Sequence, residues 1–286
     1  MSNAIGIDIG GTKIRAARIA ADGTIQDSAV LATGQSPAAV IAQIEALFGK
    51  FADARTLATG IGVPGRVDAS TGRILSGGFV NLSGELTAGL RGAVRNAPVF
   101  FDNDASMALF GEARLGAAAG LSHIVMLTIG TGIGGALMLD GRIVHGRGTA
   151  GQLGHITVDV HGRDCLCGRT GCLETFSSGT ALRACIAASG LEIATTLEHL
   201  LANRDARSQA VLERWTKPLR AGIDSLVAAF DPQIVVLGGG LGAAACEALL
   251  DFPAGSPWYQ CPVVPAALGD TAGMVGAALA ALERLR

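Results

Sequence analysis

Four side chains suited to a metal ion are concentrated in the stretch GHITVDVHGRDCLCGRTGC, where Cys165, Cys167 and Cys172 follow His155. One imidazole and three thiolates form the Cys₃His ligand set of a closed, tetrahedral structural zinc site. The Cys-x-Cys step is tighter than the spacing of common zinc fingers, so a generic finger is not the match. The sequence predicts Zn²⁺ on these four residues. The alternative is three buried or disulfide-bonded cysteines in a loop.

Three glycine-rich turns each follow an apolar run, in IDIGGTK, TIGTGIGG and VVLGGGL. Without a Cβ atom, the backbone N–H groups of such turns can approach phosphate oxygens closely and attract anions. A Walker loop does not occur, and the first turn leads into a strand rather than a helix, unlike a dinucleotide-binding fingerprint. Tight β-turns without a ligand are the alternative for each turn. Together they predict a nucleotide phosphate site formed by Gly10, Gly11, Thr12, Lys13, Gly130, Thr131, Gly132, Gly238, Gly239 and Gly240.

Two acidic positions follow apolar strands and could serve phosphoryl transfer. Asp8 precedes the first glycine turn, where a carboxylate could hold Mg²⁺ directly or through water, or could simply cap the turn. Asp104 lies in the run FFDNDASM, at the end of a predicted strand and before a helical pattern, so it could accept a proton from an attacking hydroxyl, or cap the helix. Asp102 is the competing carboxylate, and strand alternation points it opposite to Asn103. We therefore rank Asp104 first as the general base.

The elements around these residues predict an α/β fold. Short apolar runs bounded by glycine or proline indicate strands, and apolar residues at three- and four-residue spacing indicate helices. Pro218 falls inside one helical pattern and is expected to kink or break it. Strands are predicted at 4–8, 14–19, 25–31, 57–63, 99–103, 123–129, 134–139 and 234–237, and helices at 37–51, 105–115, 173–189, 206–230, before Leu250, and at 270–285.

The order of strand, Gly/Thr turn, strand and hairpin turn at 4–23 recurs at 123–141. Such a repeat suggests two related α/β lobes that face one another. We predict an N-terminal lobe at 1–115, completed by the C-terminal helix 270–286. The C-terminal lobe is predicted at 116–269 and contains the zinc loop 155–174, with a short hinge near residues 104–120.

Composition excludes several partners. The formal net charge is −2 and no basic stripe is present, so nucleic acid is not an expected partner. No uncharged apolar run reaches the roughly 18 residues of a membrane span, and the N-terminus MSNAIGIDIG lacks the basic start of a secretory signal. The other cysteines lie far apart in the chain, which favours a reduced, cytoplasmic location.

Taken together, five motifs resemble those of the ROK family of sugar kinases, within the actin-like ATPase superfamily. They are DIGGTK, DNDA, IGTGIGG, the C-x-C-G-x-x-G-C-x-E run and VVLGGG, and the resemblance extends over nearly the whole chain. The resemblance implies a two-lobed actin-like (ribonuclease H-like) fold with a zinc-stapled loop. It also implies ATP- and Mg²⁺-dependent phosphoryl transfer to a hexose hydroxyl, usually the 6-hydroxyl, and often a homodimer.

The same resemblance assigns roles to individual positions. Asp104 would be the general base. The zinc ligand His155 would also contact the sugar. The other positions implied to contact sugar are Gly65, Asn81, Asn103 and Glu174.

One position departs from the family pattern, because Gln152 stands where many members carry the Glu of E-x-G-H. An amide both donates and accepts hydrogen bonds, whereas a carboxylate accepts only, so recognition near C1 and C2 of the sugar should change. Members acting on N-acetylmannosamine sometimes lack this Glu. We therefore expect an N-acetylhexosamine substrate, N-acetylmannosamine first, with glucose and fructose as alternatives.

Two other classes of protein compete with a kinase. A sugar-responsive regulator of the same family would carry a helix-turn-helix module before the lobes, and the first phosphate turn here follows Asp8. An actin-like scaffold or chaperone would not explain the Cys₃His cluster. Both are expected to lack sugar-dependent ATP consumption.

Overall fold

The computed structural model describes residues 2–76, 85–94 and 98–285, and within them the chain forms two compact units. Unit 1 comprises Met1–Gly120, Ile143–Ala150 and Asp270–Arg286, and unit 2 comprises Leu121–Arg142 and Gly151–Gly269. The predicted boundaries leave residues 116–120 and Ile143–Ala150 with the C-terminal lobe, whereas both segments belong to unit 1. We call Ile143–Ala150 the strap. Asn81 lies outside the described residues.

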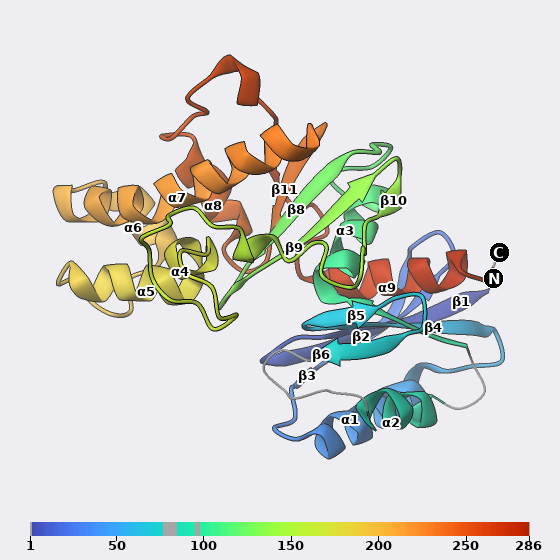
Figure 1. Cartoon of the computed structure of the whole chain (residues 1–286). Helices are drawn as coiled ribbons and strands as arrows, with labels where there is room; N and C mark the ends of the chain where they lie inside the picture. Colours follow the sequence, from blue (N-terminus) through green and yellow to red (C-terminus); the bar gives the residue numbers. More distant parts are fainter. Residues whose placement is uncertain (1, 77–84, 95–97, 286) are drawn as a thin grey trace. The chain divides into compact units, whose positions relative to one another are not determined.

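Unit 1 is built on a five-stranded mixed sheet in the order β3-β2-β1-β4-β7. The hairpins β1–β2 and β2–β3 are antiparallel, whereas β1, β4 and β7 run parallel. Figure 1 shows α1 and α2 on one face of this sheet and α9 with α3 on the other. The bounds are β1 Asn3–Ile9, β2 Lys13–Ala20, β3 Ile25–Ala32, α1 Pro37–Phe51, β4 Thr56–Val63, β5 Arg66–Asp68, β6 Arg73–Ser76, α2 Glu85–Ala93, β7 Val99–Asn103, α3 Asp104–Leu115 and α9 Ala272–Glu283.

Small residues allow α9 to lie directly on this sheet. A Cβ atom on Gly60 of β4 would fall on the carbonyl oxygen of Ala277 in α9. One on Gly276 of α9 would fall on the carbonyl oxygen of Met107 in α3. Backbones this close exclude any larger side chain. The C-terminal run of Ala and Gly is therefore the surface that joins α3 and α9 to the strands that end in the acidic motifs.

Unit 2 repeats the same sheet plan. Its order is β10-β9-β8-β11-β12, with β8–β9 antiparallel and β11 parallel to both β8 and β12. The recurrence of two sheets with one topology confirms the repeat expected from the sequence. α8 packs on β8, β11 and β12, and α7 packs against α4, α5, α6 and α8. The bounds are β8 Ile124–Ile129, β9 Ile133–Leu139, β10 Arg142–Ile143, α4 Glu174–Ser177, α5 Gly179–Ala188, α6 Leu197–Asn203, α7 Ala206–Phe230, β11 Ile234–Gly238, α8 Gly242–Leu249 and β12 Val263–Pro265.

One helix prediction was wrong in detail. The predicted helix at 173–189 is interrupted at Ser178, which has extended backbone angles and caps α5 by accepting a hydrogen bond from the N–H of Ala181. A serine hydroxyl competes for backbone N–H groups, so it starts a new helix more readily than it continues one. Pro218, in contrast, does not end α7, which continues for 25 residues with the proline inside it.

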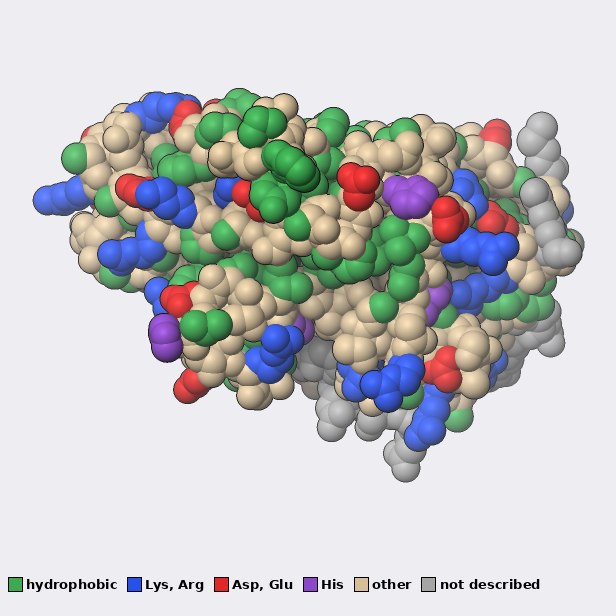
Figure 2. Space-filling view, turned by 45° about the horizontal axis from the view of Figure 1, so that its top comes forward, with side chains coloured by type: hydrophobic (Ala, Val, Ile, Leu, Met, Phe, Trp, Pro, Cys, Tyr) green, Lys and Arg blue, Asp and Glu red, His purple; other side chains and the backbone are tan. Residues whose placement is uncertain are grey.

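Charged side chains of both signs are interspersed on the face shown in Figure 2, and basic residues form no continuous stripe there. Among the described residues, no helix combines the length and apolar character needed to cross a membrane.

Candidate active site and metal cluster

The parallel strands of unit 1 bring the acidic motifs to one edge of the sheet. Asp8 of β1 is in register with Gly62 of β4, and Gly62 is in register with Asp102 of β7. The next position of β7 is Asn103, and α3 begins directly after it. Side chains at the carboxyl ends of neighbouring parallel strands meet at the same edge, where α/β proteins bind ligands. The predicted Mg²⁺ residue and the predicted base therefore belong to one edge of one sheet.

Asn103 and Asp104 are held in defined orientations at the start of α3. Asn103 caps the helix, because its side-chain oxygen accepts from the N–H of Ser106 at 3.1 Å. Its amide nitrogen donates to the carbonyl of Gly65 at 2.8 Å and to Oδ1 of Asp104 at 2.9 Å. The same Oδ1 accepts from the N–H of Ala105 at 2.9 Å. Capping is thus performed by Asn103, and the Asp104 carboxylate is oriented without being the cap.

At this edge, the carboxyl groups of Asp8 and Asp104 both resist ionisation. Burial raises the pKa of Asp104 to about 6, although the hydrogen bonds from Ala105, its own N–H and Asn103 lower it. Burial also raises the pKa of Asp8 to about 7, and repulsion from the Asp104 carboxylate adds to the rise, while Arg15 opposes it. A pKa near neutrality is what a general base requires, because such a group is ionised yet still basic enough to take a proton.

The first glycine turn lies next to Asp8 and is fixed from both sides. The N–H of Gly10 donates to the carbonyl of Lys13 at 2.9 Å, which closes the hairpin between β1 and β2. The Thr33 hydroxyl donates to the carbonyl of Gly10 at 2.7 Å. Gly11, Thr12 and Lys13 are exposed. The turn is therefore rigid at its base and open at its tip, as a phosphate site requires.

The other two glycine turns meet in unit 2. Gly130 begins the β8–β9 turn, where its N–H donates to the carbonyl of Gly132 at 3.0 Å. The N–H of Leu241, which follows the third turn, donates to the carbonyl of Ile129 at 3.0 Å. Gly239 has a φ of +75°, and a Cβ there would press on the Ile129 backbone. Both predicted phosphate turns of this unit thus share one edge of its sheet, where Thr131, Gly239 and Gly240 are exposed.

Glu174 has a bonded role that sequence reasoning did not predict. Its Oε2 accepts from the N–H of Ile133 at 2.8 Å, immediately after the second glycine turn. A Cβ atom on Gly132 would clash with the same carboxylate. Glu174 begins α4 and is the last residue of the predicted zinc loop 155–174, which we call the metal loop. It therefore links this loop to the turn that is predicted to hold phosphate.

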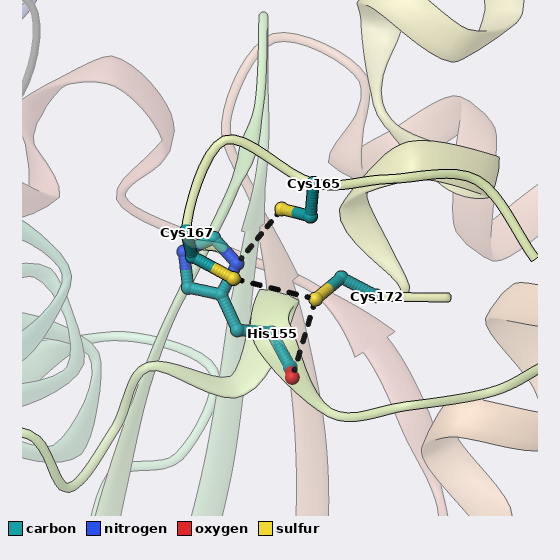
Figure 3. A group of neighbouring side chains, drawn as sticks. All are labelled: His155, Cys165, Cys167 and Cys172. Carbon is teal, nitrogen blue, oxygen red and sulfur yellow. Dashed lines mark hydrogen bonds between the residues drawn. The ribbon is translucent and has the colours of Figure 1, made fainter. Parts of the chain in front are cut away.

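The four predicted metal ligands converge (Figure 3). Their ligand atoms all lie within 4.8 Å of one another, with 3.5 Å between Nδ1 of His155 and Sγ of Cys165, and 3.6 Å between Sγ of Cys167 and Cys172. A tetrahedral zinc ion with Zn–S of about 2.3 Å and Zn–N of about 2.1 Å implies S–S edges near 3.8 Å and N–S edges near 3.6 Å. All six cysteines of the chain are free thiols, so the disulfide alternative is not realised. The cluster has the size and ligand set of a zinc site.

The loop that carries the three thiols has little core of its own. Leu166 and Val160 are exposed, whereas Cys172 and Leu173 are fully buried. Short bridges hold it, pairing Thr157 with Cys172 and Asp164 with Thr170. A metal ion would supply the cohesion that apolar contacts do not.

The pKa values of the three thiols are shifted in different directions. Burial raises the pKa of Cys165, and it raises the pKa of Cys172 to about 12. For Cys167, the rise from burial is outweighed by hydrogen bonds from the N–H of Arg169 and from the thiols of Cys165 and Cys172, together with the charge of Arg169, so the pKa is lowered. A bound cation would hold all three as thiolates.

The remaining predicted sugar residues are placed as follows. Gly65 has a φ of +97° and presents its carbonyl to Asn103. Gln152 immediately precedes the short 3₁₀ turn Leu153–His155 and is partly exposed. Asn81 falls outside the described residues.

Sequence reasoning missed the partners of Asp102, which is 5% exposed and bonds to His145 at 2.7 Å and to Arg284 at 3.3 Å. A buried aspartate requires cationic or hydrogen-bonding partners. An aspartate within an apolar strand pattern was therefore the signal in the sequence that could have prompted a search for such partners.

The model of the ROK family matches residues 4–284. The chain belongs to the ROK family. Its relatives include a glucokinase of Thermotoga maritima, 31% identical over 98% of both chains, and an N-acetylmannosamine kinase of Escherichia coli, 34% identical over 97% of both. Among solved structures, it is similar to a ROK family glucokinase of Streptomyces griseus in complex with glucose and AMPPNP. That likeness has a TM-score of 0.84 and 29% identity, and covers 99% of this chain and 100% of the other. The α/β fold with mixed sheets is thus that of ROK kinases.

Proposed function

We propose that this ROK protein is an ATP-dependent sugar kinase that transfers the γ-phosphoryl group of ATP to the 6-hydroxyl of a hexose or N-acetylhexosamine. The observation that carries the proposal is the Asp104 carboxylate. It stands at the end of β7, is oriented by Asn103 and the N–H of Ala105, and has a pKa raised by burial to about 6. Relatives named as glucokinase and N-acetylmannosamine kinase support the same reaction class.

The reaction balances with one base. Asp104 removes the proton of the attacking sugar hydroxyl as its oxygen bonds to the γ-phosphorus. The bond between the γ-phosphorus and the β,γ-bridging oxygen breaks, and ADP leaves with that electron pair. Backbone N–H groups of the glycine turns at Gly10, Gly130 and Gly239 are proposed to bind the phosphates. Sugar hydroxyls are proposed to be contacted by Gly65, Asn81, Asn103, Gln152, His155 and Glu174.

Asp8 is the residue we propose to hold Mg²⁺. It offers a partly buried carboxylate beside the first glycine turn, and the repulsion from Asp104 that raises its pKa would be relieved by a cation. When bound, Mg²⁺ would neutralise charge on the β- and γ-phosphates.

Zn²⁺ is proposed to be structural. His155, Cys165, Cys167 and Cys172 fill all four positions of a tetrahedron, which leaves no open position for catalysis. With Nδ1 of His155 facing Cys165, the second ring nitrogen remains available to a sugar hydroxyl. Glu174 would then act close to the metal loop by holding the phosphate turn.

The choice of sugar depends on Gln152. The identities to the N-acetylmannosamine kinase and the glucokinase, 34% and 31%, differ too little to decide it. An amide at this position can donate to the N-acetyl carbonyl, which a carboxylate cannot do. We therefore propose N-acetylmannosamine as the first substrate, with glucose and fructose as the alternatives within the family.

A sugar panel tests the proposal. ATP consumption is measured with glucose, fructose, mannose, N-acetylmannosamine, N-acetylglucosamine and no sugar, and the sugars are compared by kcat/KM. A kinase shows sugar-dependent turnover. Sugar binding without turnover would identify a regulator, and N-acetylated sugars ranking last would contradict the role of Gln152.

A further inference from the structure

Asp102 is a buried residue beside the proposed base, and its carboxylate contacts two side chains that are partly exposed. Asp102 is 5% exposed, and both oxygens of its carboxylate are bonded. Oδ1 accepts from the backbone N–H of Asn103 at 2.8 Å. Oδ2 faces Nε2 of His145 at 2.7 Å and Nη2 of Arg284 at 3.3 Å. Burying a carboxylate costs free energy unless cationic or hydrogen-bonding partners compensate it. The contacts of Asp102 in unit 1 supply this compensation.

The two partners come from distant parts of the chain. His145 lies on the strap, which belongs to unit 1 although the chain on both sides of it belongs to unit 2. The strap is fixed at a second point, where Nε of Arg66 donates to the carbonyl of Gly148 at 3.3 Å. Arg284 follows α9, and its guanidinium also lies over the Phe100 ring at 5.7 Å. β7 therefore ends against two segments from distant parts of the chain, and both contact Asp102.

A continuous series of hydrogen bonds leads from Asp102 to the proposed base. Asp102 holds the Asn103 N–H, and the Asn103 side chain donates to Oδ1 of Asp104. Asn103 is also the cap of α3, so its orientation sets the first turn that carries Asp104. A carboxylate that must meet a hydroxyl proton depends on such support, since misplacement by about 1 Å can cost about 100-fold in rate.

We propose that His145 and Arg284 are positioning residues for the phosphoryl transfer, acting through Asp102 on the Asn103–Asp104 pair. The inference rests on the proposed function, since it concerns the same base. It adds that the strap takes part in the reaction through His145, without contact to the sugar. It also gives a role to the second aspartate, Asp102, which stands two positions before the base and accepts from the backbone N–H of Asn103.

The test compares variants of His145 in the full-length protein, with the best sugar of the panel. We expect His145→Ala to lower kcat by about 10- to 100-fold while the KM values for ATP and sugar stay within about twofold. His145→Gln, which retains a donor near the Nε2 position, should recover most of the loss. His123→Ala is the matched control, because it removes a His–Asp pair with Asp140 in unit 2 and should leave kcat unchanged.

A double-mutant cycle distinguishes a positioning role of His145 from a purely structural one. If His145 acts through the base, His145→Ala causes no further loss in an Asp104→Asn background. Should His145→Ala fail to fold, Asp102→Asn replaces it, because that change keeps the shape and removes the charge that His145 and Arg284 face.

The outcomes distinguish this inference from the proposed function. Full kcat in His145→Ala together with an inactive Asp104→Asn overturns the positioning role alone. Full kcat in Asp104→Asn overturns the proposed base, and the positioning role with it. Additive losses in the double variant also overturn the inference, since they would show that His145 acts elsewhere.

Discussion

At the scale of single residues, the end of β7 concentrates what the proposed reaction needs. The three consecutive polar side chains Asp102, Asn103 and Asp104 each have a different role there. Asp102 is buried and bonded to His145 and Arg284, Asn103 caps α3, and Asp104 is the proposed base. The short run DNDA can combine these roles because a strand end and a helix start fall on adjacent residues.

Removal of the base gives the first prediction. Asp104→Asn keeps the hydrogen-bond acceptor for Ala105 but cannot take a proton, so kcat should fall by about 10²- to 10⁴-fold with ATP affinity unchanged. Steady-state kinetics and nucleotide titration measure both quantities. Asp140→Asn is the control, since this exposed aspartate lies in a turn with positive φ, which Asn also adopts. Near-normal turnover in Asp104→Asn would remove Asp104 from its role.

The ionisation of Asp104 gives a second prediction, with a definite sign. Its folded-state pKa of about 6 lies above the ordinary value of 3.8, so the folded protein favours the protonated form. This contribution to stability is fully present below the ordinary value and is lost as the pH rises through about 6. Asp104→Asn should therefore raise the free energy of unfolding at pH 8 by about 1–3 kcal/mol and leave it nearly unchanged at pH 4. Denaturant unfolding of the ligand-free protein at both pH values measures the difference, and an equal effect at both would contradict it.

Gln152 carries a third prediction. Gln152→Glu removes a donor, so the ratio of kcat/KM for N-acetylmannosamine to that for glucose should fall about tenfold, the typical effect of one neutral hydrogen bond. Competition between the two sugars in one assay measures this ratio directly. A ratio that rises would show that the Gln152 amide does not donate a hydrogen bond to the N-acetyl group.

At the scale of elements, sequence patterns predicted the structure correctly where a short local run of residues determines which element forms. The strands around Asp8 and Asn103 and the clustering of His155 with the three cysteines could be predicted, because apolar runs and Cys/His spacing are local signals. The break of the predicted helix at Ser178 depends on a hydroxyl that caps α5, which a helical periodicity does not reveal. Helix α6 was also missed, since it is short and depends on the Thr196 capping box.

The strap shows a different limit of sequence reasoning. Its place in unit 1 depends on the pairing of His145 with Asp102, residues far apart in the chain. Neither residue has a local pattern that indicates the other. The same holds for Glu174, whose bond to the Ile133 N–H links a helix start to a distant turn. Long-range polar contacts therefore account for most of what the sequence alone did not predict at the site.

The metal loop gives the fourth prediction. Cys167→Ser removes one of four ligands from a loop whose side chains Leu166 and Val160 are exposed, so bound zinc should be lost and the KM for sugar should rise about tenfold or more. Elemental analysis of the purified protein and sugar kinetics measure the two effects. Cys246→Ser, in α8 and outside the cluster, is the control and should retain the metal. A wild-type protein without zinc would contradict the assignment.

At the scale of the whole molecule, the chain has two sheets of the same topology, each with its own core, and the metal cluster belongs to one of them. Unit 1 contains the core around Phe51 and Phe101, together with α9, and holds neither His155 nor the three thiols. Stabilisation by a metal ion acts only on the structure that binds it. The two units should therefore respond differently when the metal is removed.

This difference gives the last prediction, in calorimetry of the intact chain. With zinc bound, we expect one transition or two closely spaced ones; after a strong chelator, the transition of unit 2 should move to lower temperature while that of unit 1 stays in place. Trp215, which is fully buried in α7, provides a fluorescence signal specific to unit 2 and should follow the earlier transition. In Cys167→Ser the chelator should have no further effect, because the ion is already absent. A uniform shift of the whole unfolding curve would instead show that the units unfold as one, and that the metal loop stabilises both.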